Sequence, residues 1–579
     1  MNAADPGLDA LARAVREWIE ADPDPATRAE AAELLAAAEV GDGEAAARLR
    51  DAFDGRLAFG TAGLRAELGA GPRRMNRVVV AQSSAGFAAF LLGRAARGET
   101  ADPPTAVIGY DTRANSEVFA RDTAEVLAGA GIEVTLFPSP VPTPVTAFAV
   151  RFLGASAGVM ITASHNPPRD NGYKVYLGDA DGGSQIVPPS DREIAALIEE
   201  AARRPLAGLP RSAAYRLAGP EIERSYVERT AAAVRAGCAG RGAGADPPPL
   251  DVVYTALHGV GAASARRVLA AAGLPAVISV PEQEQPDGSF PTLAFPNPEE
   301  PAALDLAYRL AAERGAGLVI AHDPDADRLG VAALHPAEGG FRRLTGNEIG
   351  LLLGWRAAER ARAEGRGGVL ANTIVSSPAL GAVARSYGLE HVETLSGSKW
   401  LSRIPGLIFG FEEALGYLVH PDVVGDKDGI AAAAEMLALA RECRAEGRTL
   451  WELLDEASLA FGRFSSRQIV VRYGRTAEAR EASERARNRP PAAFGRHRVE
   501  RVRDFREPGL AAVTANVLAY DLDDGSRVMI RPSGTEPKLK VYIDAFSDSG
   551  SAADRRAATD RALDGVEAAA RAYLDGLGS

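Results

Sequence analysis

Cysteine is scarce in this sequence, whose 579 residues contain only Cys238 and Cys443. The two stand far apart and without metal-ligand spacing, so a disulfide framework and a thiolate zinc site are both excluded. A chain without disulfides suits a reducing compartment. We therefore expect a cytoplasmic location.

Positive charge is also in deficit. The chain has 65 Lys and Arg against 77 Asp and Glu, a formal net charge of −12, so its overall field repels polyanions. We expect no nucleic-acid partner. The N-terminus is acidic and has no basic segment ahead of an apolar one, and no later run approaches 18 apolar residues. Neither export nor membrane insertion is expected.

Two nucleotide-binding patterns are absent or incomplete. No G-x-x-x-x-G-K-[ST] stretch occurs, which argues against a kinase of the P-loop type. LHGVGAAS, residues 257–264, resembles the G-x-G-x-x-G dinucleotide fingerprint, and Glu282 follows about 20 residues on. The third glycine is missing, and the sequence offers no evident hydride-transfer partner. A dinucleotide-dependent oxidoreductase stays open as an alternative.

The length predicts several domains, because a single hydrophobic core stops growing at roughly 250 to 300 residues. Apolar spacing predicts two helices over residues 8–53, and strands then alternate with helical stretches, as in doubly wound sheets. A Gly/Pro-rich linker at residues 239–249 precedes a second such unit, and a third follows. The expected fold class is α/β: three doubly wound domains, a smaller α+β C-terminal domain and a helical N-terminal extension.

Three carboxylates alternate along AHDPDADRLG. Asp323, Asp325 and Asp327 follow the apolar run GLVI, so a loop can turn all three toward one hard cation. An EF-hand begins in the same way, but it needs Gly where Arg328 stands and Glu where Leu334 stands. Three carboxylates with open positions suit Mg²⁺ shared with a phosphate. A solvated acidic turn is the alternative.

A serine stands in an unusual loop, TASHNPPRDNGYKVY, residues 162–176. Ser164 follows the apolar run AGVMI, at the carboxyl end of a predicted strand, where α/β sheets bind ligands. A helix N-cap is the ordinary alternative, but the Asn-Pro-Pro that follows does not start a helix in the usual way. His165 is adjacent in sequence and is badly placed to be the base of a hydrolase triad. Ser164 is therefore predicted to be a nucleophile of another kind.

Two further loops suit anion capture. RPSGTEPK, residues 531–538, offers a guanidinium, two hydroxyls and a glycine amide, and FGTAGLRAELG places Arg65 behind a glycine-rich turn. Either loop taken alone is equally compatible with an ordinary turn.

In this order, GTAGLR, TASHNPPRDNGYKVY, DPDADR, FEEALGYL and RPSGTEPKLKVY resemble the α-D-phosphohexomutase superfamily, the phosphoglucomutases and phosphomannomutases. The resemblance runs from about residue 59 to 544, and SGSKW and FGFEEALGYL…DKDG are most similar to the branch with the type 2 phosphoglucomutase/phosphopentomutase of animals. In that family four domains surround one cleft and each gives one loop. The implied boundaries are 1–54 for the extension, 55–220 for domain I with the phosphoserine loop, 221–338 for domain II with the metal loop, 339–462 for domain III with the sugar loop and 463–579 for domain IV with the phosphate loop.

By this resemblance Ser164 carries a phosphoryl group as phosphoserine. Together with Asp323, Asp325 and Asp327 it would hold Mg²⁺. A phosphoserine dianion beside three carboxylates repels itself strongly, so a divalent cation must neutralise it before transfer.

The resemblance also assigns the groups that stabilise charge and move protons. Arg65 and Arg328 would stabilise charge on the moving phosphoryl group. Lys174 would be the general acid/base, with His165 beside it, and we expect nearby cations to lower the pKa of Lys174.

Substrate recognition falls, by the same resemblance, to the third and fourth domains. Glu412 and Glu413, followed by Gly416, match the sugar-recognition loop. Many hexose enzymes have Ser after the two glutamates, where this chain has Ala414, so the exact sugar stays open. The remaining matches are Lys399 in the third domain and, for the phosphate that is not transferred, Arg531, Ser533, Gly534 and Thr535.

The implied function is a phospho-sugar mutase that exchanges sugar 1-phosphate and 6-phosphate, with glucose as the expected sugar and a sugar bisphosphate as intermediate and activator. Phosphopentomutase, phosphomannomutase and sugar 1,6-bisphosphate synthase are alternatives within the family, and a non-catalytic sugar-phosphate binder is the alternative of another class. The expected partners are small-molecule sugar phosphates, and the chain is expected to be a monomer or homodimer.

Overall fold

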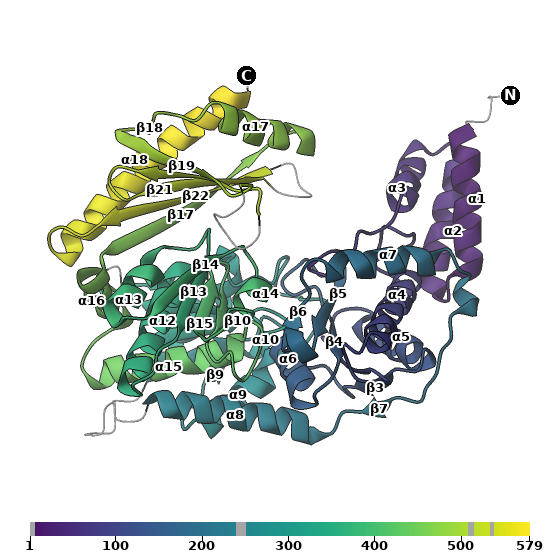
Figure 1. The fold of residues 1–579 in the computed structure, drawn as a ribbon, viewed down its shortest axis with the longest axis horizontal. Helices are drawn as coiled ribbons and strands as arrows, with labels where there is room; N and C mark the ends of the chain where they lie inside the picture. The colour runs from purple at the N-terminus through teal and green to yellow at the C-terminus, as the bar shows by residue number, and fades with distance from the viewer. Residues whose placement is uncertain (1–5, 239–249, 338, 508–513, 533–537, 579) are drawn as a thin grey trace. The chain divides into compact units, whose positions relative to one another are not determined.

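A computed structural model describes residues 6–238, 250–337, 339–507, 514–532 and 538–578. The chain divides into two compact units, drawn in Figure 1. The first contains residues 1–236, 250–332 and 420–434, and the second contains residues 237–249, 333–419 and 435–579. A short late segment, 420–434, is thus part of the first unit.

Three helices, rather than the predicted two, form the N-terminal extension: α1 (Pro6–Ala21), α2 (Pro25–Glu39) and α3 (Gly43–Phe53). The expected second helix is interrupted at Gly41, whose φ of 97° lies in the left-handed region that glycine adopts easily. Asp42 then caps α3 by accepting hydrogen bonds from two backbone N–H groups of its first turn. The buried faces of the three helices share a core with the domain that follows.

The first α/β domain is built on a mixed sheet of order β1-β5-β4-β2-β3-β7, with β6 beside β5. The inner strands are parallel, whereas β5 lies antiparallel to β4, and β1 antiparallel to β5. The sheet differs from a purely parallel one at this edge because the loop from β4 to β5 is too short for a parallel crossover. The elements are β1 (Leu64–Glu67), α4 (Arg77–Ala96), β2 (Thr105–Tyr110), α5 (Ser116–Gly129), β3 (Glu133–Leu136), α6 (Thr143–Phe152), β4 (Ala157–Ile161), β5 (Asp170–Leu177), η1 (Asp179–Asp181), β6 (Ser184–Gln185), α7 (Ser190–Ala202), η2 (Leu206–Gly208) and β7 (Arg216–Leu217).

Helix α4 is long and apolar enough to cross a membrane by length and composition. In the protein it is a core helix, with Val80, Phe87 and Leu91 fully buried. It packs against α5 and α7, so most of its apolar surface is covered by its own domain.

The second domain carries a five-stranded sheet of order β12-β11-β10-β8-β9. Strand β10 pairs in parallel with β8, and the three predicted metal-binding aspartates follow the end of β10. The elements are α8 (Pro220–Cys238), β8 (Val252–Thr255), α9 (Gly261–Ala271), β9 (Ile278–Ser279), α10 (Pro281–Glu284), η3 (Pro301–Leu304), α11 (Asp305–Arg314), β10 (Leu318–His322), β11 (Leu329–Leu334) and β12 (Phe341–Arg343).

The third sheet, in the second unit, has the order β14-β13-β15-β16. β13 is parallel to β14 and β15, and β16 returns antiparallel to β15, so the two glutamates of the sugar loop lie at a hairpin. The elements are α12 (Gly346–Ala363), β13 (Val369–Thr373), α13 (Ala379–Tyr387), β14 (Glu390–Thr394), α14 (Ser398–Leu401), β15 (Leu407–Glu412), β16 (Gly416–Leu418), α15 (Gly429–Ala445) and α16 (Leu450–Phe461).

The last domain is an antiparallel sheet of order β17-β22-β21-β20-β19-β18 with α17 and α18 against one face (Figure 1). Side chains alternate along the strands: Leu518 and Tyr520 join the core under the helices, whereas Ala519 and Met529 pack with Ile374 of the third domain. The sheet is therefore covered on both faces. The elements are β17 (Arg463–Arg472), α17 (Thr476–Asn488), β18 (Ala493–Phe494), β19 (His497–Asp504), β20 (Leu518–Leu522), β21 (Arg527–Pro532), β22 (Lys538–Ser547) and α18 (Ala552–Gly578).

Candidate active site

The Ser164 hydroxyl points at the acidic loop of the second domain. Its Oγ donates a hydrogen bond of 2.6 Å to Asp323 Oδ2, and the side chain is almost completely buried. Ser164 has a φ of 52°, in the left-handed region that a serine adopts only where its surroundings hold it. The Ser164 N–H donates to Thr162 Oγ1 at 2.9 Å, which helps to fix this conformation.

The three aspartates form a fully buried cluster. One carboxylate oxygen from each of Asp323, Asp325 and Asp327 lies within 4.8 Å of the others. Burial, and then the two neighbouring carboxylates, raise the pKa of Asp323 well above its usual value. Such a cluster is costly unless positive charge is placed in it.

Two oxygens of this cluster fit a bound cation. Asp325 Oδ1 and Asp327 Oδ1 are buried and accept no hydrogen bond from the residues that the structure describes. Carboxylate oxygens are the ligands that Mg²⁺ prefers, and an oxygen of a serine phosphate would be a further ligand. The aspartates therefore fit the predicted metal, and a solvated acidic turn is ruled out by their burial.

Lys174 supplies positive charge to the same cluster. It lies on β5, and its Nζ donates to Asp325 Oδ2 at 2.6 Å and to Asp327 Oδ2 at 2.9 Å. Burial acts to lower the pKa of Lys174, but the two carboxylates outweigh it and raise this pKa. The expected lowering of the Lys174 pKa is therefore wrong, because its nearest charges are carboxylates rather than cations.

The two predicted arginines and His165 lie at the rim of this cluster. β1 pairs with β5, so Arg65 reaches the serine loop and donates to Asn166 Oδ1 at 3.1 Å. Arg328 Nε lies 4.0 Å from Asp323 Oδ2. His165 Nδ1 is 3.2 Å from Ser164 Oγ. Burial, and then Arg328 and Arg65, lower the pKa of His165 well below its usual value, so this histidine is neutral at pH 7.

Lys427 was not singled out from the sequence, although it stands in the DKDG stretch that resembles the family. Its Nζ lies 3.4 Å from Asp327 Oδ2. Hydrogen bonds from the first unit hold the residues on either side of Lys427: Asp426 accepts from Tyr176 and Gln185, at 3.1 and 2.7 Å, and Asp428 accepts from Tyr226 at 3.0 Å. A second lysine therefore reaches the acidic cluster from a late part of the chain.

The G-x-G stretch at residues 257–264 packs against the acidic loop rather than forming a dinucleotide site. A Cβ on Gly259 would lie 2.4 Å from the backbone of Pro324, and one on Gly261 would lie 2.8 Å from Ala326 Cβ. The Val260 N–H donates to the Pro324 carbonyl at 2.8 Å. These glycines allow two loops of one domain to approach closely, so the space that a pyrophosphate would need is filled by protein.

The second unit holds the residues expected to recognise the substrate. Glu413 Oε2 accepts hydrogen bonds from the hydroxyls of Thr373 and Ser376, at 3.1 and 3.0 Å. Burial, and then the Glu412 charge, raise the pKa of Glu413. Glu412 is itself 9% exposed, so both carboxylates belong to a largely enclosed loop.

The fourth domain brings Arg531 to the SGSKW stretch of the third domain. Arg531 donates to Ser396 Oγ at 3.1 Å, and Lys399 follows in the short helix α14. The other residues predicted to bind the second phosphate, Ser533, Gly534 and Thr535, lie outside the described residues.

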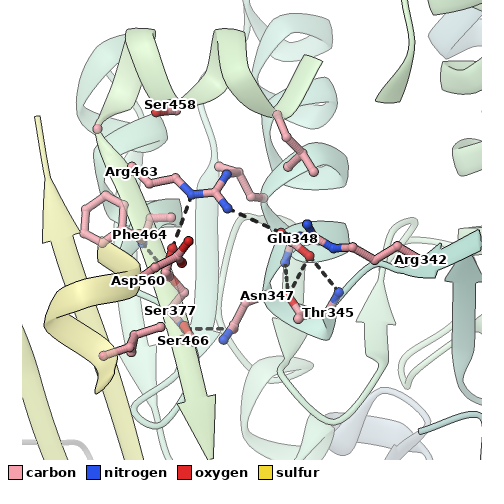
Figure 2. Close-up of a pocket in the computed structure, with 16 residues that line it drawn as sticks. Arg342, Thr345, Asn347, Glu348, Ser377, Ser458, Arg463, Phe464, Ser466 and Asp560 are labelled. Carbon is pink, nitrogen blue, oxygen red and sulfur yellow. Dashed lines mark hydrogen bonds and ion pairs between the residues drawn. The ribbon is translucent and has the colours of Figure 1, made fainter. Parts of the chain in front are cut away.

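A pocket lies at the connection between α16 and β17, and none of the predicted site residues line it (Figure 2). Its charged groups already interact with one another: Arg463 lies 3.7 Å from Glu348 and 3.3 Å from Ser465 Oγ, and Arg342 lies 3.4 Å from Glu348. The pocket is lined by residues of the third and fourth domains, and these contacts occupy its charged groups.

The fold and this cluster define an α/β protein in which a buried serine hydroxyl faces three buried carboxylates. Four family models match successive stretches: Phosphoglucomutase/phosphomannomutase, alpha/beta/alpha domain I at residues 56–204, domain II at 224–335, domain III at 345–459 and the C-terminal domain at 491–562.

Curated relatives agree. The chain is 46% identical over 483 residues to a probable phosphomannomutase of Haemophilus influenzae, covering 83% of this chain and 95% of that one. It is 36% identical to a probable phosphoribomutase of Schizosaccharomyces pombe, covering 94% and 95%, and 34% identical to a human phosphopentomutase, covering 87% of both. A phosphoglucomutase/phosphomannomutase family structure from Burkholderia thailandensis matches in fold with a TM-score of 0.66 at 20% identity, covering 90% and 98%.

This chain therefore belongs to the phosphoglucomutase/phosphomannomutase family, within the α-D-phosphohexomutase superfamily. It is an isomerase of the phospho-sugar mutase type.

Proposed function

We propose that this mutase exchanges the phosphoryl group between the 1- and 6-positions of a hexose phosphate, with glucose as the expected sugar, through phosphoserine at Ser164 and a sugar bisphosphate. One observation carries the proposal. The buried Ser164 hydroxyl lies 2.6 Å from Asp323, and the neighbouring Asp325 and Asp327 each have a buried carboxylate oxygen that accepts no hydrogen bond from the described residues and could bind a cation. A binder that performs no chemistry has no use for this arrangement.

Asp323, Asp325 and Asp327 would hold Mg²⁺ together with the serine phosphate. When bound, this cation supplies the charge that neutralises the phosphoserine beside three carboxylates. Arg65 and Arg328 lie near enough to the serine loop to stabilise the equatorial oxygens of the phosphoryl group in transfer.

In the first step a sugar hydroxyl attacks phosphorus, the bond from phosphorus to Ser164 Oγ breaks, and the proton of the sugar hydroxyl is passed to Ser164 Oγ, so that the sugar bisphosphate and a free Ser164 hydroxyl form. After the bisphosphate has turned around, the Ser164 hydroxyl attacks its other phosphate, and the bond from that phosphorus to the sugar oxygen breaks. Neutral His165, with Nδ1 3.2 Å from Oγ, can take the serine proton in this second step. Lys174 holds its proton, which suits it to donate to the oxygen that the phosphoryl group leaves.

Recognition of the sugar and of its second phosphate is assigned to the second unit. We propose that ring hydroxyls donate to Glu412 and to Glu413 Oε1, since Oε2 of Glu413 already accepts two hydroxyls. Lys399, Arg531 and the loop residues Ser533, Gly534 and Thr535 would hold the phosphate that is not being transferred.

A pentose phosphate is the second candidate substrate. Relatives named phosphoribomutase and phosphopentomutase align over most of the chain, and Ala414 has no hydroxyl to offer the sugar. A relative of 34% identity in mouse is named glucose 1,6-bisphosphate synthase, which keeps bisphosphate synthesis among the activities to test.

A coupled assay over a panel of aldose 1-phosphates tests this function. The panel contains glucose, mannose, ribose and deoxyribose 1-phosphates, each with and without the matching bisphosphate and Mg²⁺. We expect glucose 1-phosphate to be converted to the 6-phosphate only when Mg²⁺ is present, and we expect added bisphosphate to raise the rate by rephosphorylating protein that has lost its Ser164 phosphate. No conversion of any sugar by Ser164-phosphorylated protein would refute the proposal. The domain boundaries, the cytoplasmic location and the monomer or homodimer state stay predictions.

A further inference from the structure

Arg113 lies beneath the serine loop and belongs to none of the groups described above. It follows β2, and its side chain is completely buried. Its guanidinium is directed into the loop that connects β4 to β5, which carries Ser164.

The Arg113 guanidinium donates hydrogen bonds to four carbonyl groups of this loop. Nη2 donates to the carbonyls of Ser164 and Asn166, and Nη1 donates to those of Pro167, at 2.8 Å, and Asp170, at 3.1 Å. A planar fork with five donors can span these acceptors, and no other side chain offers that geometry.

The two prolines of the loop lower the free-energy cost of this arrangement. The carbonyls of Asn166 and Pro167 belong to peptide bonds whose nitrogen is proline nitrogen, Pro167 and Pro168. Turning these carbonyls toward Arg113 therefore leaves no N–H group pointing away without an acceptor.

The second domain covers the other side of the same guanidinium. The Phe290 ring centre lies 4.9 Å from the guanidinium carbon of Arg113, a cation–π distance. Gly288 permits this contact, since a Cβ there would lie 2.2 Å from the Thr112 carbonyl. Asp111 completes the enclosure, with Oδ2 3.5 Å from Arg113 Nε.

We propose that Arg113 is a positioning residue for the transfer reaction: it holds the Ser164 backbone in its left-handed conformation, so that Oγ stays directed at Asp323, and through Phe290 it fixes this loop to the domain that carries the metal ligands. The left-handed φ of Ser164 persists only where several contacts determine it, and the carbonyl of Ser164 is one of the four that Arg113 holds.

The consequence is specific to the chemical step and rests on the proposed function. Arg113 has no contact with solvent and is assigned no contact with substrate, so its loss should affect the aim of the nucleophile and not the affinity for sugar phosphate. A displacement of about 1 Å at a reacting atom costs about 100-fold in rate.

The test uses the full chain with Arg113→Ala and Arg113→Lys, and Arg77→Ala as the matched control. Arg77 is an arginine of the same domain that pairs with Asp122 through two hydrogen bonds, at 2.7 and 2.8 Å, and does not touch the serine loop. We expect kcat to fall about 100-fold in Arg113→Ala with KM unchanged, and Arg113→Lys to restore little, since one ammonium cannot span four carbonyls. Arg77→Ala should keep kcat.

Two further readouts separate positioning from folding and from function. Guanidinium ion at a concentration that does not denature should restore part of the kcat of Arg113→Ala, whereas sodium and tetramethylammonium should not. Hydrogen–deuterium exchange over residues 162–171 should accelerate in the Arg113 variants alone, whether or not the protein proves to be a glucose mutase. If Arg113→Ala does not fold, Phe290→Leu keeps the apolar cover, removes the ring and is expected to give a smaller change in the same direction.

A normal kcat in folded Arg113→Lys, or a loss confined to KM, would overturn the proposal. So would unchanged exchange of the loop in folded Arg113→Ala. Failure of the wild-type protein on every sugar phosphate, with loop exchange still dependent on Arg113, would refute the proposed function and leave the positioning role.

Discussion

The serine region of the first unit and the sugar loop of the second unit are each held in place by a different kind of interaction. Around Ser164 three buried carboxylates face two lysines, and the balance is between whole charges in a low dielectric. The Glu413 loop is held by neutral hydroxyls of Thr373 and Ser376. Removing one charge from the first region leaves others uncompensated, whereas removing one hydroxyl from the second changes a single hydrogen bond.

This difference predicts two classes of variant. Changes in the serine region should reduce kcat by orders of magnitude for every sugar. Changes in the second unit should alter KM or the choice of sugar by modest factors. The four tests below run from the largest expected effect to the smallest.

Ser164→Ala should reduce mutase activity by roughly 10⁴-fold or more, because no other group can carry the phosphoryl between steps. The purified variant should also lack the mass of one phosphate that the wild type carries. Steady-state assay and intact mass spectrometry measure both. Normal turnover in the variant would show that Ser164 is not the carrier.

Asp325→Asn should lower kcat about 1,000-fold, because it removes one of the proposed cation ligands and a charge partner that lies 2.6 Å from Lys174 Nζ. In the wild type, a chelator should abolish activity and added Mg²⁺ should restore it. Asp305→Asn, an exposed carboxylate at the start of α11, is the control and should have no effect. Full activity in excess chelator would contradict a required metal site.

Arg531→Ala should raise KM by about 10- to 100-fold, since a charge-assisted contact to phosphate is worth roughly 1.5 to 3 kcal/mol. The bisphosphate should also escape more often, which is measured as free bisphosphate released per turnover. Arg503→Ala, whose arginine pairs with Asp521 on a neighbouring strand of the sheet, is the matched control. An unchanged KM without release would remove Arg531 from the phosphate site.

Ala414→Ser should shift preference toward glucose 1-phosphate over ribose 1-phosphate by about five- to tenfold, the worth of one hydrogen bond of roughly 1 kcal/mol. The wild type should accept both sugars with comparable kcat/KM. Competition between the two substrates in one reaction gives this ratio directly. Rejection of pentose phosphates by the wild type, or no shift in the variant, would place the choice of sugar elsewhere.

The sequence by itself determined those functional groups that stand together in one short stretch of the chain. Ser164 and the three aspartates each follow an apolar strand, and the rule that ligands bind at the carboxyl ends of strands in α/β sheets predicts where they lie. Strand and helix periodicity likewise predicted the α/β class and the antiparallel last domain. The third helix of the extension was missed, since only the left-handed turn at Gly41 separates it from the second.

Only the tertiary structure decided which charges meet. Lys427 reaches Asp327 from the segment after the sugar loop, and Arg113 reaches the Ser164 carbonyl from the end of another strand. The rise in the Lys174 pKa follows from two carboxylates within 2.9 Å. Coulomb energies fall with distance and rise with burial, and neither quantity exists until the chain has folded, so the sign of such a shift cannot be deduced from a list of nearby residue types.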